Sequence, residues 1–501
     1  MATAPIVAEG NSWFSREGLH PADWKNPNPA ALYDLVIIGA GPAGLLTAYE
    51  AGRLGAKVAL VERNLFGGNC LNTGCVPSKT LIRTSRLYAD MRHADQYGAQ
   101  PPGDVVVDFG AAMERVRRIR ARIARETSIT DLTAIGVDVF FGEGRFAGRA
   151  AVAVSGDTLR FEKALIATGT RPTIPSIPGL TTAGYETHDT IFELTERPDR
   201  WVVLGGGPTG CELSQALCRL GSMVTLVQSE PMFLSGEERD AAQILSDAFE
   251  RDGIEIRLNT EAVAVRLDGT RKLVDVVRDG DTATLVADSI LVGVGETPNV
   301  DGLNLGAAGV DYDAMEGIRV DDFLTTTNAN IYAAGDVCAK RRFTHFEGAS
   351  SRLVVQNALC SGRQRVSALT IPWCTYTDPE IAHVGLYVRE ARQQEIPVKT
   401  FTVLMHDVHR AICDGEEDGF VKIHVREGTD RILGATVVAR HAGEMINDIS
   451  LAIQSGIGLA LLGRVIRPYP TQAAAIQMAA DAFNARESED SSKRKGPPLV
   501  E

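Results

Sequence analysis

The chain has 501 residues, which is enough for about three domains of 100–200 residues each. Its hydrophobic content of 44% and charged content of 23% are those of a globular protein, and a net charge of −13 argues against nucleic acid or an anionic membrane as partner. Eight cysteines are too few for a disulfide framework, and no targeting or membrane-spanning segment is evident, so we expect a cytoplasmic protein.

A strand, a glycine loop and a helix open the first predicted nucleotide-binding unit. The apolar run 32–38 leads into the loop, a small-residue helix follows to Leu54, and a second strand, 58–61, ends at Glu62. The loop carries three glycines: Gly39, Gly41 and Gly44. Glycine permits a tight turn and a close approach to a pyrophosphate, and an acid at the strand end accepts hydrogen bonds from a ribose. The segment therefore predicts a Rossmann-like βαβ unit.

Two cysteines lie five positions apart directly after this unit. Cys70 and Cys75 belong to the segment 67–79, and one helical turn plus a loop would bring their sulfurs within bonding distance. A buried thiol pair and half of a zinc site are the other interpretations. Zinc sites usually have shorter spacings and a second Cys or His cluster, which this sequence lacks. The spacing alone does not decide between a reactive pair and a buried one.

An arginine-rich helix and a second nucleotide-binding unit follow. Segment 109–127 predicts an amphipathic helix whose arginines face solvent. The second unit has a strand at 201–204, a helix to Leu220 and a strand at 224–227 that ends at Gln228. Its loop also carries three glycines: Gly205, Gly207 and Gly210. One such loop is weak evidence, but two copies framed by strand and helix predict two dinucleotide sites.

The last third of the chain changes character. A short apolar strand near residue 331 leads into Gly335 and Asp336. From about Ile371, strands and helices alternate without glycine loops, and segments 420–425 and 432–438 predict a β-hairpin.

Over residues 31–485 the chain resembles the class I pyridine nucleotide-disulfide oxidoreductases, which include glutathione reductase, dihydrolipoamide dehydrogenase and mercuric reductase. The glycine loops and the segments 67–79, 164–172 and 330–337 carry the resemblance. It implies an α/β fold with two Rossmann-like domains, for FAD and NAD(P), and a C-terminal α+β dimerisation domain. The expected division is an N-terminal extension (1–30), an FAD-binding domain (31–183 and 321–369), an NAD(P)-binding domain (184–320), a dimerisation domain (370–487) and a disordered tail (488–501).

The resemblance also implies roles for single residues. Cys70 and Cys75 would form the redox-active disulfide, with Cys75 on the flavin side and Cys70 as the interchange thiol. Lys79 would lie near the flavin, and Glu212 would pair with it beside the nicotinamide. The other residues expected to bind the cofactors, besides the glycines of the two loops, are Glu62, Thr168, Gly169, Gln228, Gly335 and Asp336. We expect a homodimer and no metal site.

Several departures from the family pattern bear on function. Pro208 replaces an aromatic gate in the second glycine loop, and Glu296 replaces an arginine. Gln228 is neither the acid of NAD-specific members nor the arginine of NADP-specific ones, and we expect a slight preference for NADPH. Tyr469 and Ala474 stand where disulfide-acting members carry a His and Glu base pair, whereas mercuric reductase has a tyrosine there.

We therefore interpret the chain as a homodimeric FAD enzyme, mercuric reductase-like, that uses NADPH or NADH. Its acceptor would be Hg(II), another soft electrophile, a quinone or a disulfide. Against Hg(II), no cysteine follows Cys413, whereas mercuric reductases end in a cysteine pair. The alternatives are a dihydrolipoamide dehydrogenase-type disulfide oxidoreductase and, from another class, a non-enzymatic flavoprotein redox sensor.

Overall fold

A computed structural model describes residues 19–100, 105–126, 128–339 and 342–494, with side chains to residue 487. The chain divides into two compact units, one made of residues 1–229 and 260–368 and the other of residues 230–259 and 369–501. Among the described helices, none combines the length and the apolar character needed to cross a bilayer. Each unit has a fold of its own.

The first unit contains a mixed sheet in the order β3-β2-β1-β6-β5-β4, and β18 pairs with β6. The strands are β1 (Tyr33–Ile38), β2 (Val58–Glu62), β3 (Asp138–Phe141), β4 (Arg145–Gly148), β5 (Ala151–Val154), β6 (Asp157–Ile166) and β18 (Ile331–Ala333). β1 is parallel to β2 and to β6, and it is almost completely buried, as expected for a parallel strand covered on both faces. β18 is parallel to β6, with Ile331 opposite Ala164, so the chain returns to this sheet after forming the second nucleotide-binding unit.

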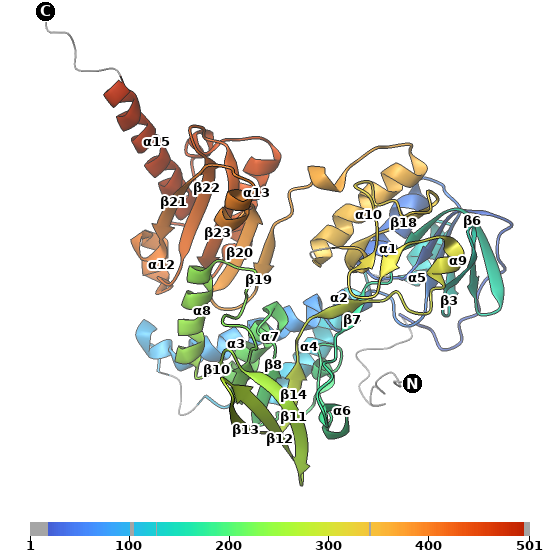
Figure 1. The fold of residues 1–501 in the computed structure, drawn as a ribbon, viewed down its shortest axis with the longest axis horizontal. Coiled ribbons are helices and arrows are strands. Elements are labelled where there is room, and N and C mark those ends of the chain that lie inside the picture. The colour runs from blue at the N-terminus through green and yellow to red at the C-terminus, as the bar shows by residue number, and fades with distance from the viewer. Residues whose placement is uncertain (1–18, 101–104, 127, 340–341, 495–501) are drawn as a thin grey trace, which may run out of the picture. The chain divides into compact units, whose positions relative to one another are not determined.

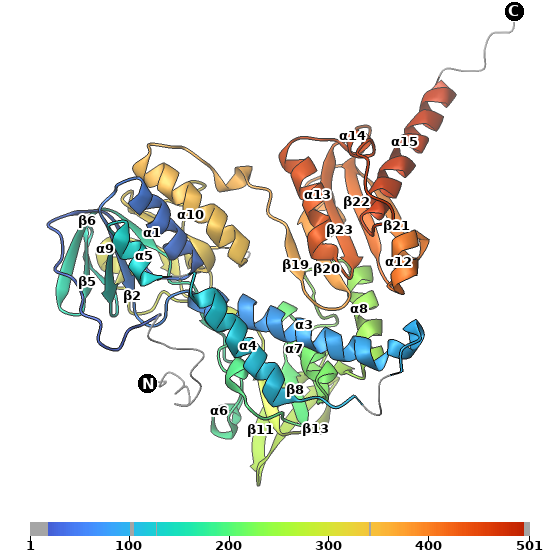
Figure 2. The ribbon, with the colours of Figure 1, turned by 180° about the vertical axis from the view of Figure 1, so that it is seen from behind.

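Two helices that are distant in sequence lie side by side in this unit. Helix α1 (Pro42–Arg53) begins with Pro42, whose fixed φ and missing N–H suit the first helical turn. Helix α10 (Thr344–Leu359) runs along α1, blue and light orange in Figure 2. The Ser351 hydroxyl joins them by donating a hydrogen bond of 2.8 Å to the carbonyl of Ala43.

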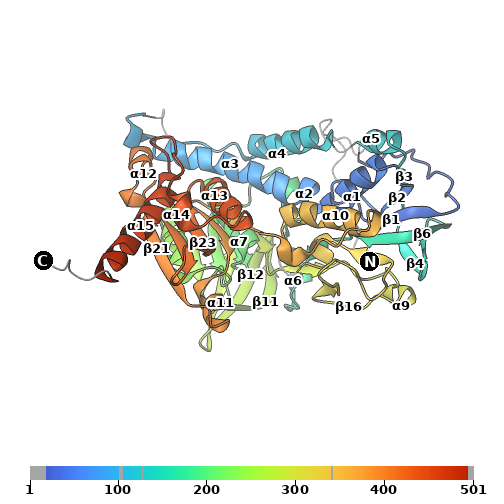
Figure 3. The same ribbon diagram turned by 90° about the horizontal axis from the view of Figure 1, so that it is seen from above.

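The second nucleotide-binding segment has parallel strands in the order β9-β8-β14. These are β8 (Arg200–Leu204), β9 (Met223–Val227) and β14 (Ser289–Val292). Helix α7 (Pro208–Arg219) lies between β8 and β9 in the chain and packs against α3 (Cys75–Arg92), which also contacts α4 (Phe109–Ala124) (Figure 3). An antiparallel sheet follows, formed by β11 (Glu261–Asp268), β12 (Arg271–Arg278) and β13 (Asp281–Ala287). Both predicted βαβ units are therefore present.

Shorter elements complete the first unit. They are α2 (Gly68–Asn72), α5 (Ile129–Ala134), α6 (Leu180–Ala183), α9 (Leu305–Ala308), β7 (Thr170–Pro172), β15 (Glu296–Pro298), β16 (Tyr312–Asp313) and β17 (Gly317–Ile318).

The sequence predicted that the arginines of helix α4 face solvent, and for two of them this is wrong. Asp108 caps the helix, accepting a hydrogen bond of 2.8 Å from the Ala111 N–H. Arg117 and Arg120 are buried, and Arg120 pairs with Glu193 at 2.7 Å and donates to the carbonyl of Asn72 at 3.0 Å. A charged side chain is buried at low cost only when it is paired, so this helix is part of the support for the segment that carries Cys70.

Packing also departs from the expected segment boundaries. Val300, Leu303 and Ile318 belong to the same hydrophobic cluster as strands β1 and β6, so this stretch packs with the first sheet although 184–320 was expected to form the NAD(P) domain. At the other end, Asn26 exchanges two hydrogen bonds, of 3.0 and 2.8 Å, with the backbone of Phe141 at the end of β3. Part of the expected N-terminal extension is thus attached to the sheet, and residues 1–18 lie outside the described residues.

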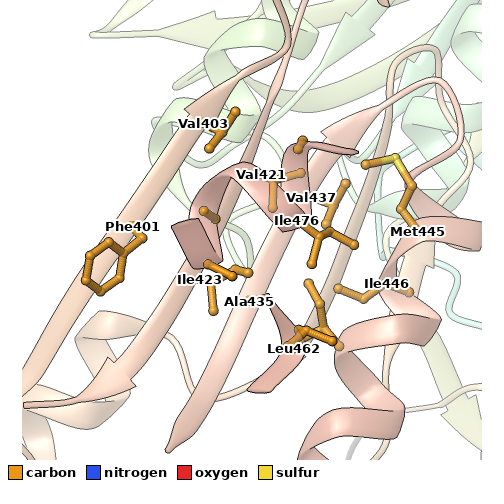
Figure 4. Packing of buried hydrophobic residues seen from close by; sticks show 14 of the residues in the cluster. Phe401, Val403, Val421, Ile423, Ala435, Val437, Met445, Ile446, Leu462 and Ile476 are labelled. Carbon is orange, nitrogen blue, oxygen red and sulfur yellow. The ribbon is translucent and has the colours of Figure 1, made fainter. Parts of the chain in front are cut away.

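The second unit is an antiparallel sheet covered on one face by helices α13 (Ala442–Gln454) and α15 (Ala474–Arg494) (Figure 1). The sheet order is β19-β20-β23-β22-β21, with β19 (Trp373–Thr375), β20 (Glu380–Gly385), β21 (Val398–Leu404), β22 (Phe420–Arg426) and β23 (Ile432–Ala439). Alternate residues of these strands, such as Val421, Ile423, Ala435 and Val437, meet Ile446 and Ile476 of the helices in one core (Figure 4). The predicted β22–β23 hairpin is confirmed.

The remaining elements of the second unit are α8 (Arg239–Asp252), β10 (Glu255–Arg257), α11 (Val388–Gln393), α12 (His409–Asp414) and α14 (Leu459–Leu462). Segment 230–259 joins this unit through polar contacts. Glu237 accepts hydrogen bonds from Trp373 at 2.8 Å and from Tyr387 at 2.6 Å, and Lys422 pairs with Glu238 at 2.7 Å.

The tail predicted to be disordered from residue 488 is helical to Arg494, as the continuation of α15. A helix that is already nucleated by packing extends at little cost through residues such as Glu, Lys and Arg. Residues 495–501 lie outside the described residues.

Candidate active site

The two cysteines singled out in the sequence lie next to each other in the first unit. Cys70 is in the short helix α2, and Cys75 is the first residue of α3. Both are free thiols, and they are hydrogen-bonded to each other. Gly67 and Gly68, with φ of 90° and 56°, allow the turn into α2. The expected pair is therefore assembled, in its dithiol form.

The environment divides the two thiols into a strong and a weak acid. The hydrogen bond from Cys70 and the positive charge of Lys79 lower the pKa of Cys75 to about 6, against the opposing effects of burial and of Glu212. The Thr344 hydroxyl, 3.0 Å from the Cys75 sulfur, contributes in the same direction. The hydrogen bond to Cys75 and burial raise the pKa of Cys70. At neutral pH the reduced pair therefore holds a Cys75 thiolate and a Cys70 thiol.

A half-buried ion pair connects the two nucleotide-binding segments beside these sulfurs. Lys79 Nζ lies 2.8 Å from Glu212 Oε2, and the Glu212 side chain is only 6% exposed. Lys79 is on α3, one turn after Cys75, and Glu212 is in the first half of α7. The two residues that the resemblance paired are thus in contact, although 133 positions separate them.

The glycine loops have no room for side chains where the chain turns. A Cβ at Gly44 would lie 1.8 Å from the carbonyl oxygen of Gly39, and a Cβ at Gly210 would lie 1.9 Å from that of Gly205. Gly39 and Gly205 have φ of 107° and 104°, which favours glycine. A Cβ at Gly41 or Gly207 would meet no atom closer than 3.8 Å, so the middle of each loop leaves space on its open side. Both loops therefore fit the close approach of a pyrophosphate.

The strand-end residues Glu62 and Gln228 hold these loops in the same way. Glu62 Oε2 accepts a hydrogen bond of 2.7 Å from the Ala40 N–H, and Gln228 Oε1 accepts one of 2.9 Å from the Gly206 N–H. The other Glu62 oxygen accepts from Asn64 at 2.7 Å, and burial raises the pKa of this carboxyl. A carboxylate oxygen has the capacity to accept a second hydrogen bond, so contact between Glu62 and a ribose stays a prediction.

Thr168 and Gly169 fasten the crossover between the two segments. The Thr168 hydroxyl donates to the carbonyl of Asn299 at 2.8 Å, and the carbonyls of Thr168 and Gly169 each accept a hydrogen bond of 2.9 Å from Asn299. Nearby, Glu296 accepts a hydrogen bond of 2.9 Å from the Thr170 hydroxyl. Thr168 and Gly169 thus have a structural task in addition to the cofactor contact that we expect of them.

Asp336 carries a buried oxygen without a partner among the described residues. Gly335 and Asp336 form a 3-10 turn directly after β18, and Asp336 Oδ1 has no hydrogen bond although it is buried. An unpaired buried carboxylate oxygen is costly unless a ligand supplies a donor. The hydroxyls of the FAD ribityl chain are such donors. The open glycine loop, Glu62 and Asp336 therefore fit FAD in the first segment.

Tyr469 belongs to the second unit and is 77% exposed. Its hydroxyl lies 3.0 Å from Nδ1 of His409, and the two rings meet edge to face at 6.1 Å. The role expected for Tyr469 requires the segment of a partner subunit and stays a prediction. Sequence analysis did not single out His409, because nothing in the local pattern connects it with a residue 60 positions away.

Thr344 was likewise assigned no role from the sequence. Its contact with Cys75 spans 269 positions and has no sequence signal of its own. Among the residues that the structure describes, no group of three or more His, Cys, Asp or Glu side chains is arranged to hold a metal ion.

Comparison with known proteins agrees with this site. The family model of the pyridine nucleotide-disulphide oxidoreductases matches residues 33–358, and the model of their dimerisation domain matches residues 371–480. A mercuric reductase of Bacillus cereus is 34% identical over 452 residues, which cover 90% of this chain and 72% of that protein. A dihydrolipoyl dehydrogenase of Mycoplasma pneumoniae is 32% identical over 448 residues, which cover 88% of this chain and 96% of that protein.

Similar structures have also been solved. The HOCl-induced flavoprotein disulfide reductase RclA of Escherichia coli superposes with a TM-score of 0.80 at 27% identity, covering 90% of this chain and 99% of that chain. LpdA of Mycobacterium tuberculosis superposes with a TM-score of 0.81 at 28% identity, covering 90% of this chain and 99% of that chain.

The family match covers both nucleotide-binding segments and the C-terminal sheet, and the sulfur pair lies where the two segments meet. Members of this family are enzymes that use FAD and NAD(P)H. The chain therefore belongs to the class I pyridine nucleotide-disulfide oxidoreductases.

Proposed function

We propose that this enzyme uses NADPH or NADH to reduce Hg(II), or another soft electrophile of that kind, at the Cys70–Cys75 pair. The observation that carries the proposal is the division of the pair into a thiolate with a pKa of about 6 and a thiol whose pKa is raised. Thiolates are the preferred ligands of soft metal ions and the reactive form towards electrophiles.

Bound FAD supplies a relay that takes two electrons from the nicotinamide and passes them to the sulfur pair. The residues of the chain prepare that pair. The hydrogen bond from Cys70, the charge of Lys79 and the Thr344 hydroxyl keep Cys75 ionised near neutral pH. Cys70 holds a proton that it must release when a metal ion binds both sulfurs. The net reaction is NAD(P)H plus Hg(II) giving NAD(P)⁺, Hg(0) and one proton, which balances two electrons.

Two similarities support a thiophilic metal ion as acceptor. Proteins 34% identical to this chain are mercuric reductases, and a Cu(II) complex of RclA is among the similar solved structures. In addition, Tyr469 offers a phenol where disulfide-acting members carry a histidine base. A neutral phenol is a weaker base than an imidazole, and a metal ion held by thiolates needs no proton transfer there.

One observation favours the alternative, a lipoamide dehydrogenase-type activity. His409 lies 3.0 Å from the Tyr469 hydroxyl and brings an imidazole to the position where the sequence lacks one. General acid–base assistance is worth about 10²–10⁴-fold in rate, so a working His409–Tyr469 pair would restore disulfide turnover. Dihydrolipoyl dehydrogenases at 32% identity are consistent with this alternative.

The experiment compares acceptors anaerobically with the purified enzyme. We expect NADPH oxidation with thiol-complexed Hg(II) and release of mercury vapour, which separates reduction from simple binding to thiols. We expect weak turnover of lipoamide with NADH. Lipoamide rates equal to those of a working dehydrogenase, without mercury vapour, would favour the lipoamide dehydrogenase-type activity instead. A flavin that neither nucleotide reduces would favour the redox sensor.

Two variants locate the reaction. Cys75→Ser should abolish Hg(II) reduction, because the thiolate is lost. Cys360→Ser is the matched control. Cys360 is an exposed thiol that follows the last residue of α10, whereas Thr344 is the first residue of that helix, and Cys360 has no part in the proposed site.

A further inference from the structure

A second carboxyl group lies against the Asp336 turn. Glu347 is the fourth residue of α10, and only 8% of it is exposed. A Cβ placed on Gly335 would lie 3.4 Å from Glu347 Cγ and 3.2 Å from the Ala43 Cβ. Gly335, the residue before Asp336, therefore lies against both Glu347 and Ala43 in the first turn of α1.

The two carboxyl groups are hydrogen-bonded to each other, and each keeps one buried oxygen that has no partner among the residues that the structure describes. These oxygens are Asp336 Oδ1 and Glu347 Oε2. A hydrogen bond between two carboxyls requires a proton on one of them. The pair therefore presents two unpaired oxygens and one shared proton.

The surrounding charges indicate where that proton resides. Burial and the negative charge of Asp336 raise the pKa of Glu347 well above its usual value, with Cys75 and Glu296 acting in the same direction. The pKa of Asp336 is raised to about 6 by burial and Glu296, while Arg342 opposes the shift. Of the two carboxyls, Glu347 is therefore the one that holds the shared proton and donates it to Asp336.

We propose that Glu347 is a second hydroxyl-binding residue of the FAD site, which acts with Asp336 as a pair that shares one proton. Asp336 Oδ1 accepts one ribityl hydroxyl and the Glu347 carbonyl oxygen accepts another, while the Glu347 O–H keeps Asp336 ionised. A polyol is the ligand chemistry that satisfies two neighbouring acceptors. The proposal rests on FAD as cofactor and is independent of the electron acceptor.

Two substitutions separate the hydrogen bonds of Glu347 from its proton. Glu347→Gln keeps a donor towards Asp336 and a carbonyl acceptor but does not titrate, whereas Glu347→Ala removes both contacts. Glu143→Gln is the control, because Glu143 is exposed in the same unit.

The test dilutes the purified holoprotein and follows the fluorescence of released FAD from pH 6 to 10. We expect Glu347→Ala to release FAD on the order of 10-fold faster at pH 7, and Glu347→Gln to behave like the wild type there. Towards alkaline pH the wild type should lose FAD faster, because two adjacent carboxylates repel each other once the shared proton is gone. That acceleration should be absent in Glu347→Gln.

Two results would overturn the proposal. One is unchanged FAD release in Glu347→Ala. The other, which needs only the conservative variant and holds even if the alanine variant does not fold, is the same pH profile in Glu347→Gln as in the wild type.

Discussion

Replacement of Thr344 by valine tests how the protein keeps Cys75 ionised. Valine has nearly the shape of threonine but lacks the hydroxyl that lies 3.0 Å from the Cys75 sulfur. A hydrogen bond to a charged group contributes about 1.5–3 kcal/mol, and one pKa unit corresponds to about 1.4 kcal/mol. The pKa of Cys75, about 6 in the wild type, should therefore rise to about 7–8.

The sign follows from which form the hydroxyl stabilises. Donation to the thiolate lowers the pKa, so its loss favours the thiol and moves the titration to higher pH. At pH 7 the ionised fraction of Cys75 should fall from about nine-tenths to between about a half and a tenth. Reactions at neutral pH that need the Cys75 thiolate should slow in proportion to the fall in its ionised fraction.

The assay uses the thiolate-to-flavin absorption band in the Cys70→Ser background, where Cys75 has no disulfide partner. The band should disappear as the pH falls through the Cys75 pKa, and it should do so at a higher pH in Thr344→Val than in the Cys70→Ser parent, which keeps Thr344. Thr344→Ser keeps the hydroxyl and should titrate like the parent. A midpoint common to all three proteins would refute the assignment of Thr344 to thiolate stabilisation.

Three further predictions concern the sulfurs, the nucleotide and the assembly. Cys75→Ser should abolish the long-wavelength absorption band, and Cys70→Ser should show it without added reductant; spectra unchanged in both would remove the pair from the site. Gln228→Glu should shift preference towards NADH in stopped-flow flavin reduction, because a carboxylate repels a 2′-phosphate; a wild-type selectivity above about 10³, or about 4 kcal/mol, would mean that another residue reads the ribose. The protein should sediment as a dimer in analytical ultracentrifugation, since residues 371–480 match a dimerisation domain, and a fully active monomer would contradict this.

Local sequence was sufficient for the elements whose chemistry is local. The glycine loops were predictable because their constraints act within a few residues. A positive φ and a close approach of two backbone segments both exclude a side chain at these positions. The β22–β23 hairpin followed from the alternation of apolar residues along each strand. The Cys70–Cys75 segment was recognised from its spacing and its resemblance to a family.

The electrostatics of the site depended on contacts that no local pattern encodes. Thr344 reaches Cys75 from 269 positions away, and Glu347 meets Asp336 because α10 packs along α1. The arginines of α4 illustrate the same limit, since the helical pattern predicted a solvent-facing side but Arg120 is buried against Glu193. The pattern of a helix defines its faces, and only its packing decides which of them water reaches.

The sequence by itself thus determined the two nucleotide-binding units and the C-terminal hairpin, because each depends on backbone geometry or periodicity within a short segment, and its resemblance to a family indicated the redox pair. Only the tertiary structure decided which acids and donors surround the sulfurs and the Asp336 turn. Those pairings depend on the relative positions of helices α1, α3, α7 and α10, which result from the packing of the whole unit. The pKa values that separate Cys75 from Cys70 are consequently a property of the folded unit rather than of the segment that carries the two cysteines.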